Sequence, residues 1–86
     1  MAITILYLAW VRDRVGITEE VIEMLPSGVD TPTALARWLS QRGDGYASAF
    51  KDTERLRCAV DLQMTAMDAP LGRPREIAFF PPVTGG

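Results

Sequence analysis

The sequence contains no histidine and a single cysteine, Cys58, among its 86 residues. Histidine is the commonest metal ligand and acid–base group near neutral pH, so its absence excludes histidine-based chemistry. One cysteine cannot form an intramolecular disulfide bond, which fits a reducing, cytoplasmic location. Cys58 also lies on the apolar side of an alternating run, where a buried, inert thiol is more typical than an exposed nucleophile.

The chain also lacks an excess of positive charge and a long apolar run. Nine lysines and arginines stand against eleven acidic residues, a balance that does not favour nucleic-acid binding. The apolar run 3–11 has about half the ~20 residues that a membrane span needs, and no cleavage site follows it. No glycine-rich phosphate loop occurs, and no pair of carboxylates has a spacing that indicates a site. The sequence therefore predicts no metal, bound cofactor, nucleic-acid partner, membrane partner or catalytic site of its own.

Apolar periodicity predicts a chain of short strands around a helix. The expected strands cover residues 3–10, 18–25, 57–62 and 76–80, with a short extended piece at 65–67. The expected helix covers residues 32–42, and shorter helical turns are expected at 10–15 and 46–50. Residues 52–55 are predicted to form a solvated loop.

The helix has clear boundary signals. Thr31 is suited to cap its N-terminus, and Pro32 fits the first helical position. Leu35, Trp38 and Leu39 form one apolar stripe, and Gly43 is expected to end the helix.

Two strands, a crossover helix and further strands predict an α+β fold with a mixed sheet packed on one main helix. Right-handed crossover packing would place the first and last strands side by side and parallel. This is the β-grasp, or ubiquitin-like, architecture; an α+β roll is the alternative. We expect a β-grasp domain at residues 1–80 and an extended tail at residues 81–86.

The tail, Pro81-Pro82-Val83-Thr84-Gly85-Gly86, has a composition suited to insertion into a partner. Pro81 and Pro82 hold the chain extended without internal hydrogen bonds, which lowers the entropy lost on binding. Gly85 and Gly86 have no side chain, so their backbone can pass through a narrow channel and deliver an unshielded carboxylate. Fully extended, the six residues reach roughly 20 Å.

Strand alternation predicts where the last strand contacts its surroundings. Ile77 and Phe79 share one face of the strand and are expected to enter the core. Phe80 would then lie on the opposite face of the sheet, where Leu8 and Met64 are expected to join it in an exposed apolar patch that binds partner proteins. The alternative is that one or two of these three side chains cap the core.

Residues 76–86, which read EIAFFPPVTGG, resemble the C-terminal signature of the small subunits of molybdopterin synthase. The segments 6–12, 15–16, 59–61 and 70–71 are also similar to that family. The chain departs from the family pattern at Asp61-Leu62 and at Pro74-Arg75, and these departures concern turns rather than the tail.

The resemblance implies a sulfur carrier. An E1-like enzyme would use ATP to adenylate the carboxylate of Gly86, and a sulfur donor system would convert the adenylate into a thiocarboxylate. The tail would then enter the large subunit of the synthase, in a heterotetramer, and sulfur would be transferred to cyclic pyranopterin monophosphate to form molybdopterin.

Three other functions stay open at the level of sequence. The first is a sulfur carrier for another pathway, such as thiamine thiazole synthesis. The second is a ubiquitin-like modifier joined through Gly86 to lysines of other proteins. The third is an interaction module in which the terminal glycines have no role.

Overall fold

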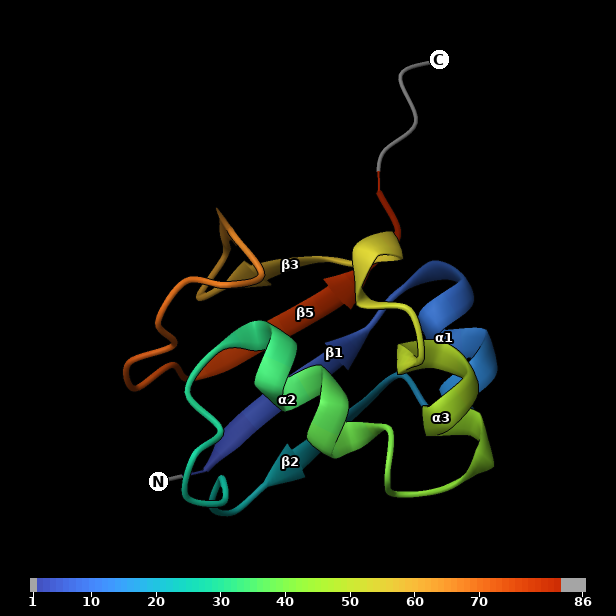
Figure 1. Cartoon of the computed structure of the whole chain (residues 1–86), viewed down its shortest axis with the longest axis horizontal. Coiled ribbons are helices and arrows are strands. Elements are labelled where there is room, and N and C mark those ends of the chain that lie inside the picture. Colours follow the sequence, from blue (N-terminus) through green and yellow to red (C-terminus); the bar gives the residue numbers. More distant parts are fainter. Residues whose placement is uncertain (1, 83–86) are drawn as a thin grey trace.

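The computed structural model describes residues 2–82 (Figure 1). The elements of this part of the chain are β1 (Ile3–Tyr7), α1 (Ala9–Val15), β2 (Glu19–Ile22), α2 (Pro32–Leu39), α3 (Asp44–Phe50), the 3₁₀ helix η1 (Thr53–Arg55), β3 (Arg57–Val60), β4 (Gln63–Thr65) and β5 (Glu76–Phe80). The last strand has the bounds that the sequence predicts.

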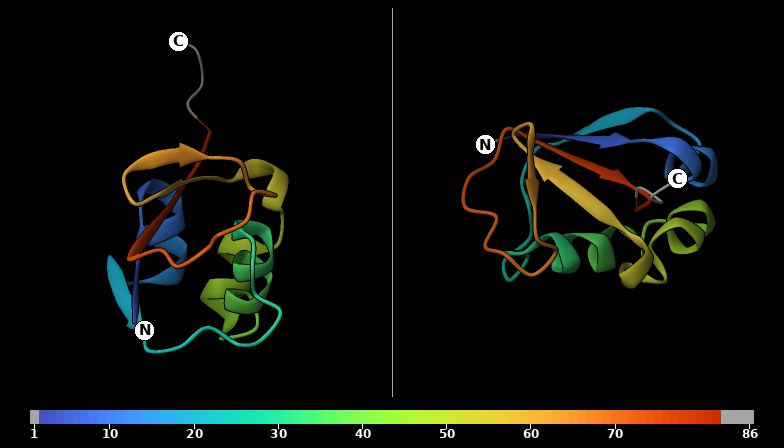
Figure 2. Two further views of the ribbon diagram at one scale, coloured as in Figure 1. Left: turned by 90° about the vertical axis from the view of Figure 1, so that its left-hand side faces the viewer. Right: turned by 90° about the horizontal axis from the view of Figure 1, so that it is seen from above.

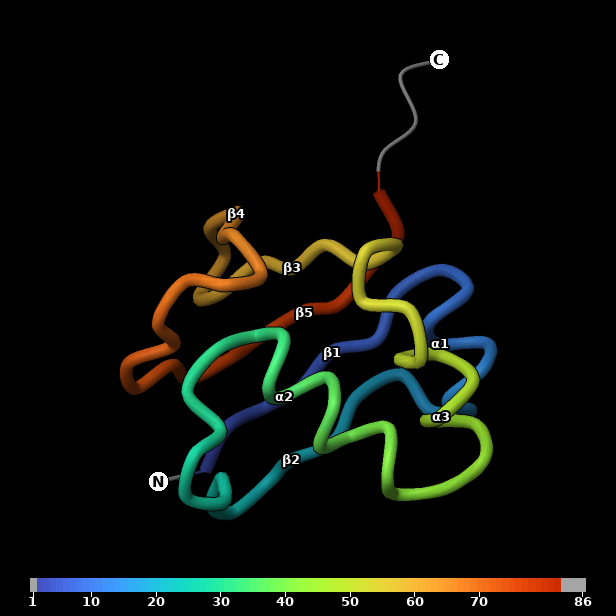
Figure 3. Tube along the Cα trace, in the orientation of Figure 1, coloured from blue at the N-terminus to red at the C-terminus, as the bar shows by residue number. Residues whose placement is uncertain are grey.

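The strands form one mixed sheet in the order β2-β1-β5-β3-β4. β1 and β5 pair in parallel, and every other pair of neighbouring strands in this order is antiparallel. The last strand therefore lies in the middle of the sheet, next to the first, as the tube in Figure 3 shows. The predicted parallel pairing and the β-grasp architecture are confirmed.

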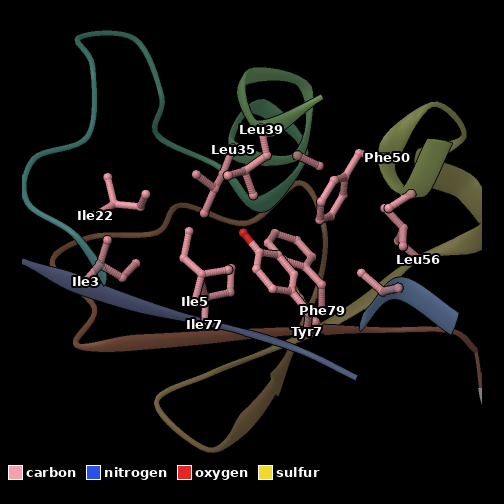
Figure 4. Close-up of a cluster of buried hydrophobic side chains, with 14 of the residues drawn as sticks. Ile3, Ile5, Tyr7, Ile22, Leu35, Leu39, Phe50, Leu56, Ile77 and Phe79 are labelled. Carbon is pink, nitrogen blue, oxygen red and sulfur yellow. The ribbon is translucent and has the colours of Figure 1, made fainter. Parts of the chain in front are cut away.

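The helices cover one face of the sheet (Figure 2). The core lies between them, where side chains from alternate positions of β1 and β5 meet α2, α3 and the segment before β3 (Figure 4). Phe79 and Phe50 are both buried and pack edge to face, with ring centroids 5.1 Å apart. The opposite face of the sheet, called the outer face below, carries the residues that alternate with the core positions.

The helix boundary signals act as predicted at the N-terminus of α2. The Thr31 hydroxyl accepts a hydrogen bond from the backbone N–H of Ala34, and Pro32 occupies the first turn. The turn predicted at 10–15 is the seven-residue helix α1, which ends at Gly16 in the left-handed conformation, with φ of 98°.

The predicted end of the main helix is wrong. α2 stops at Leu39 rather than Arg42, because the last residues form tighter i→i−3 bonds: Gln41 N–H donates to Trp38 O, and Arg42 N–H to Leu39 O. Gly43 does not end this helix; it is the N-cap of α3. α2 also shares its face of the sheet with α3, a helix of nearly the same length.

The other differences concern the ends of strands and the loop at 52–55. That loop contains the 3₁₀ helix η1, in which the Glu54 N–H donates a hydrogen bond to the Asp52 carboxylate. β2 is shorter than predicted, and the short extended piece lies at Gln63–Thr65 rather than 65–67. β3 ends at Val60, and Leu62 is 87% exposed instead of facing the core. Asp61 and Leu62 both have positive φ, so a tight turn breaks the alternation there.

Glu20 links β1, β2 and α3 through its side chain. Its Oε2 accepts hydrogen bonds from the Tyr7 hydroxyl at 2.8 Å and the Tyr46 hydroxyl at 2.6 Å, and its Oε1 pairs with Arg42 at 3.0 Å. Burial, and then the hydrogen bond to Glu20, raise the pKa of Tyr7 far above its usual range. Tyr7 therefore stays a neutral donor to the Glu20 carboxylate at physiological pH.

Candidate functional site

The strand that leads into the tail is held on both sides. β5 pairs with β1 over Glu76–Phe79 and with β3 over Ile77–Phe80. The Leu8 N–H adds a hydrogen bond of 3.1 Å to the carbonyl of Phe79, near the end of the strand. Ile77 and Phe79 are fully buried in the core, as predicted. The start of the tail is thereby fixed by the most central strand of the sheet.

Phe80 lies on the outer face and is partly exposed. The parallel register aligns Tyr7 with Phe79, so the next residues, Leu8 and Phe80, are neighbours on the outer face. Leu8 is 41% exposed. Two of the three predicted patch residues are therefore side by side at the end of the sheet from which the tail leaves.

Met64 lies on the same face but one row further along. It pairs with Ala59, which in turn pairs with Ala78, so Met64 does not lie directly opposite Phe80. It is 68% exposed. The small side chains of Ala59 and Ala78 leave a shallow apolar floor between Met64 and the Leu8–Phe80 pair.

Two members of this surface were missed from the sequence. Leu6 aligns with Ala78, and Arg57 aligns with Phe80, so both lie on the outer face around the three predicted residues. Alternation within β1 and β3 carried the signal, because Leu6 alternates with Ile5 and Tyr7, and Arg57 precedes the buried Cys58.

The tail begins beside α1 and η1. Figures 1 and 2 show the chain leaving the end of β5 next to these two segments. Pro81 and Pro82 are both partly buried there. Ala9 has φ of 55°, a left-handed conformation that turns β1 sharply into α1 beside the tail. The other predicted tail residues, Val83, Thr84, Gly85 and Gly86, lie outside the described residues.

The two departures from the family pattern meet in space. The Asp61 carboxylate accepts hydrogen bonds from the N–H groups of Arg75 and Glu76, at 2.9 and 3.0 Å. Asp61 therefore anchors the start of β5 to the β3–β4 turn, which is a structural role. Both departures lie at the end of β5 opposite the tail.

The remaining chemically reactive groups are part of the framework. Cys58 is fully buried, its Sγ lies 3.2 Å from the carbonyl of Thr65, and burial raises the pKa of its thiol. Between residues 2 and 82, no three side chains of the metal-ligating types gather into a group. No helix in the same range is long and apolar enough to cross a bilayer. The feature of the described residues that remains as a site is the outer face with the base of the tail.

Comparison with known proteins agrees with this geometry. The ThiS family model matches residues 5–86. The molybdopterin synthase sulfur carrier subunit of Escherichia coli (strain K12) is 37% identical over 86 residues, covering 98% of this chain and 99% of that protein. The chain belongs to the ThiS family. The molybdopterin synthase sulfur carrier subunit of Haemophilus influenzae is 31% identical over 84 residues, with 98% and 99% coverage. These relatives confirm the resemblance seen in the sequence.

Two solved structures support the fold. A putative molybdopterin converting factor, subunit 1, from Pyrococcus furiosus matches with a TM-score of 0.64 and 21% identity, covering 96% of this chain and 99% of that one. SAMP1 from Haloferax volcanii matches with a TM-score of 0.59 and 16% identity over the full length of both chains. At these identities the likeness concerns the β-grasp fold alone.

Proposed function

We propose that this protein is the sulfur-carrier subunit of a molybdopterin synthase and works through the carboxylate of Gly86. The observation that carries the proposal is that the central strand, β5, is followed directly by Pro81 and Pro82, the first residues of the tail. The last two residues of that tail are Gly85 and Gly86. The full-length similarity to two molybdopterin synthase sulfur carrier subunits supports it.

The chemistry begins with activation of a poor electrophile. A carboxylate does not react with a sulfur nucleophile, because its oxygen is a poor leaving group. An E1-like enzyme would join the Gly86 carboxylate to the α-phosphate of ATP with loss of pyrophosphate. A sulfur donor would then attack the acyl carbon, AMP would leave, and the thiocarboxylate would remain on Gly86. That sulfur is a softer nucleophile than oxygen and would be delivered to cyclic pyranopterin monophosphate to build molybdopterin.

The tail has the physical properties for this transfer. Pro81 and Pro82 favour an extended backbone, and a fully extended segment of six residues would reach roughly 20 Å at most. Glycines at the last two positions place no side chain near the reacting carbon. In this proposal the catalytic side chains and the ATP site belong to the partners. The carrier itself needs no bound cofactor.

The outer face supplies the docking surface in this proposal. Leu8 and Phe80 lie beside the tail, and Met64 lies across the floor of Ala59 and Ala78. An exposed apolar surface next to the tail suits a partner that binds the tail and the outer face of the sheet in the same complex. We propose that the large subunit, in a cytoplasmic heterotetramer, and the activating enzyme use this surface in turn.

The central test is mass spectrometry of the purified chain. After incubation with the activating enzyme, ATP and a sulfide source, the C-terminal peptide should gain the mass of one oxygen-to-sulfur exchange, and a reaction without ATP should not. Branched peptides on lysines of other proteins would instead indicate a modifier. No change in mass would contradict the proposal.

Deletion of Gly86 provides the matched variant. Because the deletion leaves every residue of the hydrophobic core in place, the last of which is Phe79, the shortened chain should unfold at the same urea concentration as the full chain. It should also fail to gain sulfur and fail to support molybdopterin synthesis by the large subunit. Molybdopterin formation by the shortened chain would refute the assignment of Gly86.

A further inference from the structure

Two arginines stack on one tryptophan at the end of the molecule where the tail begins. The guanidinium carbon of Arg14 lies 4.4 Å from the centroid of the Trp10 ring, and that of Arg55 lies 6.0 Å from it. Arg14 comes from α1 and Arg55 from η1, so the indole links the two segments beside which the chain leaves β5. The Arg14 Nη1 also donates to the carbonyl of Ser48, at 3.3 Å, which fixes its position.

Arg57 extends this group to the outer face. Its Nη1 donates to the carbonyls of Glu54 and Leu56, at 3.2 and 2.8 Å, and its backbone aligns with Phe80. We call Arg14, Arg55 and Arg57, with Trp10, the arginine cluster. Through Arg57 the cluster reaches the strand position next to Phe80, the last residue before the tail.

The charge of the cluster is uncompensated within the described chain. The ion pairs between residues 2 and 82 are Arg12–Asp13 and Arg42–Glu20, so none of the three cluster arginines has a carboxylate partner there. All three are exposed. Like-charged guanidinium groups held close together repel each other, and an anionic surface relieves that repulsion.

The segments that contain the cluster carry a net positive charge, whereas the rest of the chain carries a net negative charge. Segments 9–15 and 51–57 together hold five basic and three acidic residues, whereas the rest of the sequence holds four basic and eight acidic residues. The positive end is therefore a local feature of an otherwise acidic protein. Its field is directed at whatever approaches the tail.

We propose that the arginine cluster docks against an acidic surface of the large synthase subunit, beside the opening that receives the tail. This inference rests on the proposed function. A protein surface suits the cluster better than a small phosphate ligand, since the three arginines are exposed and come from three different elements, α1, η1 and β3. Arginine fixed on an aromatic ring loses little freedom when it pairs with carboxylates. The cluster steers the tail toward its channel before the apolar contacts form.

The test is the rate of association with the large subunit from the same organism, measured by stopped-flow fluorescence at several salt concentrations. In low salt, the double variant Arg14→Glu/Arg55→Glu should associate about tenfold more slowly than the natural chain or worse, because steering changes association rates by 10-fold to 10³-fold. The difference should shrink in high salt, as the charges are screened.

Matched variants separate a local effect from a change of net charge. Arg37→Glu/Arg73→Glu makes the same charge change on α2 and on the loop before β5, at the end of that strand away from the tail. It should associate within about twofold of the natural rate. Arg14→Lys/Arg55→Lys keeps the charge and should keep most of the salt dependence. Should the glutamate variant fail to fold, Arg14→Gln/Arg55→Gln replaces it.

Three results would overturn the proposal. Equal salt dependence for the cluster and control variants would show that the cluster does not steer binding. An unchanged association rate, combined with a raised KM for ATP in the activating reaction, would assign the arginines to nucleotide contact. If the natural chain gains sulfur but does not bind the large subunit, the partner is wrong; if it does neither, the proposed function itself fails.

Discussion

Neighbouring phenylalanines on β5 should respond to substitution in opposite ways. Phe79 is fully buried against Phe50, so Phe79→Ala removes a large core side chain and should destabilise the fold by about 3–5 kcal/mol. A domain of this size has about 4–13 kcal/mol of stability in total. The loss corresponds to a fall of roughly 12–40 °C in melting temperature. The variant should be partly unfolded at 37 °C.

Phe80→Ala should leave the fold largely intact. Its side chain lies on the partly exposed outer face, so the expected loss is about 1–2 kcal/mol. Binding should suffer more, because a central aromatic contact contributes about 2 kcal/mol or more to a protein interface. That loss corresponds to a dissociation constant about 30-fold higher for the large subunit.

Urea unfolding, followed by the fluorescence of Trp10 and Trp38, measures the first quantity, and isothermal titration calorimetry with the large subunit measures the second. Asp68→Ala, at an exposed position away from the tail, serves as a control for both. An equal loss of stability in the two phenylalanine variants would show that Phe80 is a core residue. Unchanged binding by Phe80→Ala would remove the outer face from the proposed interface.

Three further predictions concern the framework. Leu62→Gly should stabilise the fold by about 1 kcal/mol in urea unfolding, because Leu62 is exposed and has φ of 70° in the β3–β4 turn. A loss of stability would show that the Leu62 side chain stabilises the turn. Gly45→Ala should destabilise the fold by about 1–3 kcal/mol, since an added Cβ would overlap the carbonyl oxygen of Arg14. Ser48→Ala on the same helix should have little effect. Equal melting temperatures for the two variants would contradict the close packing of α1 and α3. Stability should also fall as pH rises above about 10. In that range tyrosine ionises in the unfolded chain, whereas Tyr7 stays neutral in the folded chain because burial raises its pKa, so the unfolded state is favoured. Tyr7→Phe should make that decline shallower in urea titrations between about pH 8 and 11, and an unaltered slope would argue against the Tyr7–Glu20 interaction.

The part of the fold that follows from local rules was predictable from the sequence. β5 is a short apolar run between Glu76 and Pro81, so its bounds were predicted, and the two-residue period of a strand placed Ile77 and Phe79 in the core. The start of α2 was predicted for the same reason, because Thr31 and Pro32 act through neighbouring backbone groups. These signals need no information about distant parts of the chain.

Features decided by distant contacts were not predictable. Leu62 continues the alternation of β3, yet Asp61 is drawn into a turn because its carboxylate binds the start of β5 fourteen and fifteen residues later. Glu20 resembles any surface carboxylate until Tyr7, Tyr46 and Arg42 meet it. The stacking of Arg14 and Arg55 on Trp10 likewise depends on how α1 and η1 come together.

The central position of β5 also bears on how the molecule is made. Chains fold from the N-terminus as they leave the ribosome. β1 and β3 have no direct pairing with each other, so the sheet has a gap until Glu76–Phe80 has been synthesised. Closing that gap joins segments about seventy residues apart, a late and slow type of contact. A molecule that has folded has therefore already made the strand that leads into its tail, and a chain that stops before it remains open to proteolysis.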